Sequence, residues 1–424
     1  MSQPLQMVMS VICTTPGSFS LMGIPVEFIL FAITLLGVAF LHNHTTKVAL
    51  AGFSAILLYK IAFTDFSIVR HIAGSETHEG EWHTLLNLFG LLTGFTILAD
   101  YFEKSGIPKK LPSILPNDWK GGFVLLVFIA VLSSFLDNIA AAMIGGAIAH
   151  VVFKGKVHIG YIAAIVAASN AGGAGSVVGD TTTTMMWIDG VAALDVLHAF
   201  VASAAAILIF GIIAAVQQHN YQPIVKEFQK GEDIDYRKIL IVIMILAGAL
   251  LANVFLEFPA IGVWIAILLG TLLGPVPWKM IPGAIQVSIF LLALVLCASL
   301  MPVEKLPAAS WQSAFVLGFV SAVFDNIPLT KLALEQGGYD WGVLAFSVGF
   351  GGSMIWFGSS AGVAISNMYP QAKSVGDWVR NGWHIIIAYI VGFFVLLGTL
   401  GWHPHTPHKN SKQIPAKVNT HLPD

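Results

Sequence analysis

Two copies of one short motif decide the fold. The first copy is Ser133-Ser-Phe-Leu-Asp137-Asn138-Ile139, and the second is Ser321-Ala-Val-Phe-Asp325-Asn326-Ile327. Each lies in the middle of a long apolar block, over residues 121–153 and 308–336. An Asp at the centre of a membrane helix is expensive, by about 2.5–3.5 kcal/mol on insertion scales. The pattern therefore predicts that each block is a re-entrant hairpin with the Asp-Asn pair at its tip.

A second motif also occurs twice, in the same order. It reads Gly172-Gly173-x5-Gly179-Asp180-Thr181 in the first half and Gly351-Gly352-x5-Gly358-Ser359-Ser360 in the second. Each copy interrupts an apolar run, over residues 157–187 and 341–366. Non-helical backbone at membrane depth is tolerated where it lines a cavity or is buried in protein. The repeat therefore predicts two broken helices that face a binding site rather than lipid.

The composition excludes most other classes of protein. Of 424 residues, 56% are hydrophobic and 10% are charged, whereas a soluble domain has about 25% charged residues. The two cysteines, Cys13 and Cys297, support no disulfide framework, and a net charge of −2 gives no basic surface for a nucleic acid. The chain is expected to be an all-α polytopic membrane protein.

The apolar runs divide the chain into two similar halves. Besides the hairpins and broken helices, each half has four runs of roughly span length: 22–41, 46–64, 82–99 and 190–216, then 239–257, 260–274, 283–300 and 382–401. The expected units are first scaffold helices (1–120), a first transport unit (121–216), a linker (217–238), second scaffold helices (239–307), a second transport unit (308–401) and a polar tail (402–424).

The number of crossings predicts that the two halves are inverted relative to each other. Three spans, a hairpin that does not cross, a broken helix and a final span give an odd number of crossings per half. This arrangement is typical of secondary transporters with a site between the repeats. With the 104–120 segment and the 217–238 linker in the cytoplasm, Lys and Arg distribute 14 inside against 5 outside, as the positive-inside rule favours.

The paired motifs supply the candidate site residues. Carboxylate and amide oxygens ligate hard cations, so Na⁺ is expected at Asp137/Asn138 and at Asp325/Asn326. The helix breaks add further candidates for binding the cation or a proton: Asp180, Ser169, Asn170, Gly172, Gly173, Gly351, Gly352 and Ser353. Supporting roles are expected for Ser133, Ser134, Ser321, Thr181 and Lys331.

Several of these residues also have simpler interpretations. Asp180 is placed to cap the second half-helix, and the serines can bond to carbonyls of their own helix. Lys331 either pairs with Glu335 one turn away or serves as counter-ion to a core Asp. The histidines of the 76–83 loop and of the His403-x-His405-x-x-His408 tail can bind a metal or sense pH, but a solvated loop and a loose tail are favoured.

At this point the residues resemble a known family. Leu136-Asp137-Asn138, Ser169-Asn170-Ala-Gly172-Gly173-Ala and Gly179-Asp180-Thr-Thr-Thr-Thr-Met-Met-Trp187-Ile188 are similar to sodium/proton antiporters of the NhaD type. These belong to an ion-transporter superfamily that also holds citrate, divalent-anion/sodium and arsenite carriers. The resemblance covers about residues 85–401 and implies a scaffold plus a transport domain, opposed hairpins, an elevator-like motion and commonly a homodimer.

The sequence therefore predicts a transporter and not an enzyme. The expected activity is antiport of Na⁺, with Li⁺ as a further cargo, against H⁺, without a resident cofactor. A carboxylate shielded from water can hold a proton or a cation, but not both. The alternative is a citrate- or dicarboxylate-type carrier coupled to Na⁺ or H⁺; such members resemble Ser-Asn-Thr at the hairpin tips, where this chain has Asp-Asn. A multi-pass location among the lipids of a bacterial inner membrane is expected.

Overall fold

The protein is almost entirely helical. The structure is a computed structural model that describes residues 19–21, 23–41, 44–75, 78–225 and 233–405. The described strands are short: β1 (Ser20–Leu21) pairs with β2 (Ile24–Pro25), and β3 (Gly74–Ser75) with β4 (His78–Glu79). Within the described residues, six helices are long and apolar enough to cross a membrane. The prediction of an all-α polytopic membrane protein is confirmed.

Continuous helices occupy the runs predicted as ordinary spans. In chain order they are α2 (Val26–Phe40), α3 (Thr45–Phe63), α5 (Trp82–Glu103), α11 (Ala193–Leu197) with α12 (Ala199–Tyr221), α13 (Tyr236–Leu256), α14 (Pro259–Gly270), α15 (Ile281–Ser299) and α21 (Trp383–Leu400). The run expected to be one unbroken helix over 190–216 is divided at His198, which keeps helical backbone angles, so α11 and α12 form one apolar stretch. Short helices α4 (Ile68–Ala73), α6 (Ile107–Ile114) and α20 (Val375–Asn381) connect them.

The four interrupted segments break where the motifs predict. The hairpins are α7 (Trp119–Ser133) with α8 (Asn138–Val152) and α16 (Trp311–Ser321) with α17 (Asn326–Gln336). The broken helices are α9 (Ile159–Ala174) with α10 (Thr181–Ile188) and α18 (Trp341–Gly351) with α19 (Ser360–Met368). At about 1.5 Å per residue, each of these helices is too short to cross the hydrocarbon core of about 30 Å.

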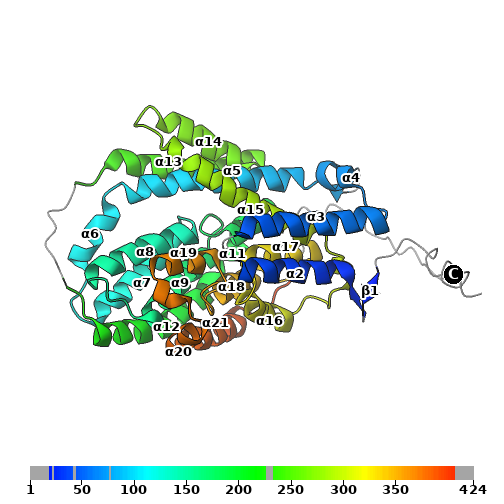
Figure 1. The fold of residues 1–424 in the computed structure, drawn as a ribbon. Helices are drawn as coiled ribbons and strands as arrows, with labels where there is room; N and C mark the ends of the chain where they lie inside the picture. Colours follow the sequence, from blue (N-terminus) through cyan, green and yellow to red (C-terminus); the bar gives the residue numbers. More distant parts are fainter. Residues whose placement is uncertain (1–18, 22, 42–43, 76–77, 226–232, 406–424) are drawn as a thin grey trace, which may run out of the picture.

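The helices form two groups that lie against each other (Figure 1). One group, the scaffold, contains α2, α3, α5, α13, α14 and α15, and the other, the transport unit, contains the interrupted helices with α12 and α21. Within the transport unit the halves interlock, because α8 packs on α19, α10 on α17, and α9 on α18. The halves are therefore not separate domains. Their opposite orientation in a membrane stays a prediction.

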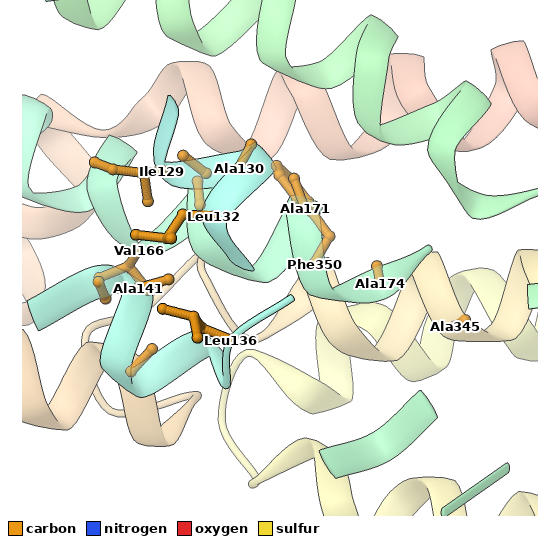
Figure 2. Close-up of a cluster of buried hydrophobic side chains, with 14 of the residues drawn as sticks. Ile129, Ala130, Leu132, Leu136, Ala141, Val166, Ala171, Ala174, Ala345 and Phe350 are labelled. Atoms are coloured by element: carbon orange, nitrogen blue, oxygen red, sulfur yellow. The ribbon is translucent and has the colours of Figure 1, made fainter. Parts of the chain in front are cut away.

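Small residues allow the interrupted helices to pack closely at the centre. Every residue of α9 from Gly160 to Ala174 is buried, and so is all of α18. Figure 2 shows Ala171 of α9 beside Phe350 of α18, with Leu136 and Ala141 of the first hairpin nearby. A Cβ at Gly172 would meet the carbonyl oxygen of Ala130, and a Cβ at Gly351 would meet that of Gly318. The same close backbone approach, which favours small residues at helix contacts, thus recurs at matching positions of both halves.

Candidate functional site

The two hairpin tips have the same local construction. Asp137 leaves the helical conformation and caps α8, where its Oδ1 accepts a hydrogen bond from Ile139 N–H at 2.7 Å. Asp325 caps α17 in the same way, accepting from Ile327 N–H at 3.0 Å. An aspartate is a favoured N-cap, and the helix N-terminus stabilises its negative charge. The motif therefore folds into a tip that holds a half-buried carboxylate.

The second half-helices begin with caps of different charge. Asp180 caps α10 through Oδ1, which accepts from Thr182 N–H at 3.2 Å. Ser359 caps α19 through Oγ, which accepts from Gly362 N–H at 3.2 Å. Asp180 is only 2% exposed, and within the described part of the chain its Oδ2 has no hydrogen-bond partner. Capping therefore uses one oxygen of Asp180 and leaves the other for a different role.

A chain of neutral side chains joins the two halves behind the tips. Asn138 Nδ2 donates to Asn170 Oδ1 at 3.1 Å, and Asn170 Nδ2 donates to Ser353 Oγ at 2.9 Å and to Ser359 Oγ at 3.2 Å. All four residues are buried. The structure thus brings together Asn138, Asn170 and Ser353, which the sequence placed in separate motifs.

Three serines among the predicted binding and supporting residues donate to backbone carbonyls, whereas Ser133 Oγ has no hydrogen-bond partner among the described residues. Ser169 Oγ donates to Val166 O in its own helix, Ser134 Oγ donates to Ala130 O and Gly172 O, and Ser321 Oγ donates to Val348 O. Gly173 approaches Asp180 so closely that a Cβ there would lie 2.9 Å from the Asp180 Cβ. Gly352 makes the equivalent approach to Ser359, at 3.1 Å. The helix breaks are therefore closed over the two caps.

A cavity of about 470 Å³ lies between the scaffold and the transport unit. Its walls come from α5 and α15 on one side and from α8 and α10 on the other, and Asp137, Asp180 and Thr181 line it. The far end holds Asp100 and Glu103 of α5 beside the start of α15, on the side predicted to be cytoplasmic. The lining of this cavity, drawn from the described residues, has four carboxylates and contains no Lys, Arg or His.

Asp325 has a different environment from Asp137. It does not line the cavity. Its Oδ1 accepts from Ile327 N–H, and its Oδ2 accepts from Ser360 Oγ at 3.2 Å. Both oxygens of Asp325 thus have protein donors, whereas the cavity reaches Asp137 directly. The two tips share a construction but not an environment.

Lys331 lies in a separate buried cluster. Its Nζ is 2.7 Å from Glu335, 3.0 Å from Glu81 and 3.7 Å from Asp189, and Thr84 donates to Asp189 at 2.9 Å. The local Lys331–Glu335 pair expected from their spacing is present. The expectation of a solvated loop is wrong for Glu81, which is 6% exposed, because a lysine 250 positions away in the sequence pairs with it. Glu81 directly precedes the α5 span, and burial raises the pKa of its carboxyl to about 7 while Lys331 opposes that rise.

The start of the tail is docked rather than loose. His403 N–H donates to Asp340 at 2.9 Å, and His405 Nε2 lies 2.9 Å from Asp195. His408 and the rest of the tail lie outside the described residues, as does the 226–232 part of the linker. Within the residues that the structure describes, no group of three or more His, Cys, Asp or Glu side chains is placed to hold a metal ion.

Sequence reasoning missed three acidic residues that the structure brings to these places. Asp100 and Glu103 lie at the far end of the cavity, and Asp189 lies beside Lys331. The three-residue spacing of Asp100 and Glu103 puts them on one helix face, a signal that was available. Nothing local in the sequence connects Asp189 to Lys331.

Fold and site together define a polytopic membrane protein whose discontinuous helices meet around buried carboxylates. No protein-family model matches the chain. The chain is 27% identical over 333 residues to sodium/proton antiporter 1 of Arabidopsis thaliana. The matched region covers 67% of this chain and 55% of that protein. It is 25% identical to sodium/proton antiporter 2 of the same plant, over 67% of this chain and 76% of that protein.

A third relative is also named as a sodium/proton antiporter. The chain is 24% identical over 347 residues to the Na⁺/H⁺ antiporter NhaD of Alkalimonas amylolytica, covering 68% of this chain and 65% of that protein. The chain therefore spans about half to two thirds of the length of the first and third of these relatives. The resemblance to NhaD-type sodium/proton antiporters is confirmed, and the relatives are named as transporters rather than enzymes, as predicted.

Proposed function

We propose that the protein is a sodium/proton antiporter that exchanges Na⁺, and also Li⁺, for H⁺ at buried aspartates. The observation that carries the proposal is the cavity, which leads to Asp137 and Asp180 and whose described lining has four carboxylates and no basic side chain. The names of the relatives support the same activity. Asp325, at the matching tip, is the third proposed exchange group.

The chemistry follows from burying carboxylates without a built-in cation. A carboxylate removed from water favours its protonated form, and an oxygen-seeking cation that arrives through the cavity favours the ionised form. Binding of one therefore displaces the other. Carbonyl ends and N–H ends of half-helices at the breaks supply further oxygen ligands and fixed dipoles.

An anion carrier of the citrate or dicarboxylate type is disfavoured by the same cavity. An anion entering it would meet Asp100, Glu103, Asp137 and Asp180. Lys331, the basic residue predicted to lie nearest the core, is already held by three carboxylates in a separate cluster. The cavity therefore selects for positive charge.

The deciding experiment measures proton movement in liposomes that contain the purified protein. A pH gradient is set up with a fluorescent reporter, and Na⁺, Li⁺, K⁺ and citrate are added in turn. We expect Na⁺ and Li⁺ to dissipate the gradient and citrate to have no effect. Uptake of radiolabelled citrate with no Na⁺-driven proton movement would overturn the proposal in favour of the anion carrier.

The surroundings of the protein are part of the proposal. Apolar side chains on α13 and α14 are exposed, among them Leu250, Val254, Phe255 and Leu268. We propose that they contact the lipid of a bacterial inner membrane or a second copy in a homodimer. Light scattering in detergent, which gives the protein mass, distinguishes a dimer from a monomer.

A further inference from the structure

The two halves differ at one pair of matching positions. When Gly172-Gly173 is aligned with Gly351-Gly352, Asn170 matches Gly349 and Asp180 matches Ser359. One position thus changes from a long amide to no side chain, and the other from a carboxylate to a hydroxyl. The changes are complementary in size.

In the structure these positions meet across the two halves. Asn170 of α9 donates to Ser359, the cap of α19, at 3.2 Å. Gly349 of α18 faces Asp180, the cap of α10, and a Cβ at Gly349 would lie 3.4 Å from Asp180 Oδ2. We call the contact of Asn170 with Ser359 the first junction, where a long side chain meets a short one. The contact of Gly349 with Asp180 is the second junction, where a carboxylate meets backbone without a side chain.

The first junction is saturated. Asn138, Asn170, Ser353 and Ser359, here called the neutral joint, are all buried and bonded to one another. The Asn170 amide uses both its oxygen and its nitrogen on these partners. The neutral joint has no titratable group and is not part of the cavity lining. A cation entering it would have to break several buried hydrogen bonds without gaining a charged ligand.

The second junction is unsaturated. Asn326 matches Asn138, which pairs with Asn170 in the first junction. The match of Asn170 is Gly349, which has no side chain, and among the described residues Asn326 Nδ2 has no partner. Asp180 Oδ2 is likewise unpartnered, and the two residues are only 3% and 2% exposed. Rotating the Asn326 amide presents its oxygen in place of its nitrogen. The cavity reaches Asp180.

We infer that the chain binds a single monovalent cation at the second junction, with Asp180 and Asn326 as ligands, and that the neutral joint binds none. The inference rests on the proposed antiport and narrows its three proposed exchange groups, Asp137, Asp180 and Asp325, to one cation site at Asp180. Binding breaks the O–H bond of the Asp180 carboxylic acid and releases that proton to the cavity, while the carboxylate keeps the electron pair and faces the cation.

The first test counts bound Na⁺. Isothermal titration calorimetry on the purified full chain in detergent, at a pH where the liposome assay shows exchange, should give one Na⁺ per chain. Two Na⁺ per chain, with antiport intact, would overturn this inference and leave the proposed function standing. Absence of both Na⁺ binding and Na⁺/H⁺ exchange would overturn the proposed function itself.

The second test uses matched variants of the two junctions. Outer-sphere partners of a metal alone are worth about 10–100-fold in affinity, so Asn326→Ser should weaken Na⁺ binding by about tenfold or more. Asn138→Ser breaks the neutral joint and should lower the melting temperature, while the stoichiometry stays at one. An equal loss of Na⁺ affinity in both variants would overturn the inference.

A third test exchanges the junctions. The double variant Gly349→Asn with Asp180→Ser gives the second junction the residues of the neutral joint. It should abolish Na⁺ binding, and circular dichroism should show that the protein stays folded. The double variant Asn170→Gly with Ser359→Asp gives the first junction a carboxylate and should add a second bound Na⁺ per chain. Retained Na⁺ binding in the first double variant would overturn the inference, and Asn326→Ser decides the question if that double variant does not fold.

Discussion

Buried and half-buried carboxylates occur in two regions of this protein, with opposite arrangements of charge. Glu81, Asp189 and Glu335 surround Lys331, and each has its carboxylate within 3.7 Å of the ammonium. Asp137 and Asp180 line the cavity, where the described residues include no basic side chain. The first group, the Lys331 cluster, carries its own cation. The second has no cation of its own in its described lining, which is the arrangement that the proposed ion exchange requires.

The difference teaches where burial of charge is structural and where it is functional. The Lys331 cluster joins the start of α5 in the scaffold to the end of α10 and to α17 in the transport unit. A pair of this kind is costly to break, because each partner would be left buried and unpaired. Asp137 and Asp180 lie in a cavity whose described lining has no basic side chain, so neutralising them should affect transport and leave the fold intact.

The largest effect on stability is expected from Lys331→Met. The substitution leaves three carboxylates without the cation between them, and breaking a buried pair costs about 3–5 kcal/mol. The melting temperature of the purified protein in detergent should fall sharply. Lys373→Met is the control, because Lys373 is exposed and its replacement should leave the melting temperature unchanged. Equal melting temperatures for both variants would show that the cluster contributes nothing to the fold.

The glycines at the helix breaks come next. Gly173→Leu and Gly352→Leu force a side chain against the caps Asp180 and Ser359, and overpacking costs about 1–3 kcal/mol. We expect protein in the membrane but no Na⁺/H⁺ exchange in liposomes. Gly398→Leu is the control, since a Cβ at Gly398 would meet nothing within 4 Å. Normal Na⁺/H⁺ exchange in Gly173→Leu or Gly352→Leu would show that the helix breaks are not part of the transport site.

A smaller, pH-dependent effect is expected from Glu81→Gln. Burial raises the pKa of Glu81 to about 7, above an ordinary glutamate at about 4.3, so the folded state holds a proton that the unfolded state has lost. This contribution to stability is fully present below about pH 4.3 and is lost as pH rises through about 7. Unfolding measured at pH 5 and pH 8 should show a smaller pH dependence for Glu81→Gln.

The groups that face Glu81 set the control for this prediction. They are Lys331 and Glu335 on α17, Asp189 after α10 and His71 of α4, whose carbonyl accepts from Glu81 N–H. His71 also carries an ionisable ring, so the comparison is made in a His71→Gln background as well. The same pH dependence with and without Glu81 would assign it to another member of the cluster.

How far the sequence predicts this molecule depends on whether a signal is local. The hairpin tips and helix breaks were predicted because an Asp or a pair of glycines inside an apolar run is unusual. Such a signal can be recognised from a few neighbouring residues of the sequence. The cap at Asp180 follows from the same local signal, whereas the caps at Asp137 and Asp325 were found only in the structure. The neutral joint was only half predictable: its members were candidates, but their pairing depends on how α9 packs on α18.

Partners far apart in the sequence were not predictable. Lys331 and Glu81 are joined across 250 positions, and a loop composition rich in Glu and His indicated solvent. The contact between His405 and Asp195 was unpredictable for the same reason, because these two residues meet only after the helices have packed. Local patterns gave the elements and their caps, whereas tertiary packing decided which charges are paired.

The smallest effect on stability, and the complete loss of function, is expected from Asp137→Asn and Asp180→Asn. Asn caps a helix about as well as Asp, so the bonds to Ile139 N–H and Thr182 N–H are kept while the charge is removed. No buried cation loses its partner, and the free energy of unfolding should stay within about 1 kcal/mol of the unmodified protein. Na⁺- and Li⁺-driven proton movement should disappear, because an amide cannot exchange a proton for a cation.

Asp235→Asn is the matched control for this prediction. Asp235 caps α13 through bonds from Arg237 N–H and Lys238 N–H, but it is not part of the cavity lining. The same substitution there should change neither the melting temperature nor the exchange. Full exchange in Asp137→Asn and Asp180→Asn would remove both carboxylates from the mechanism. A large loss of stability in those two variants would instead place them with the Lys331 cluster, as charges that the fold itself requires.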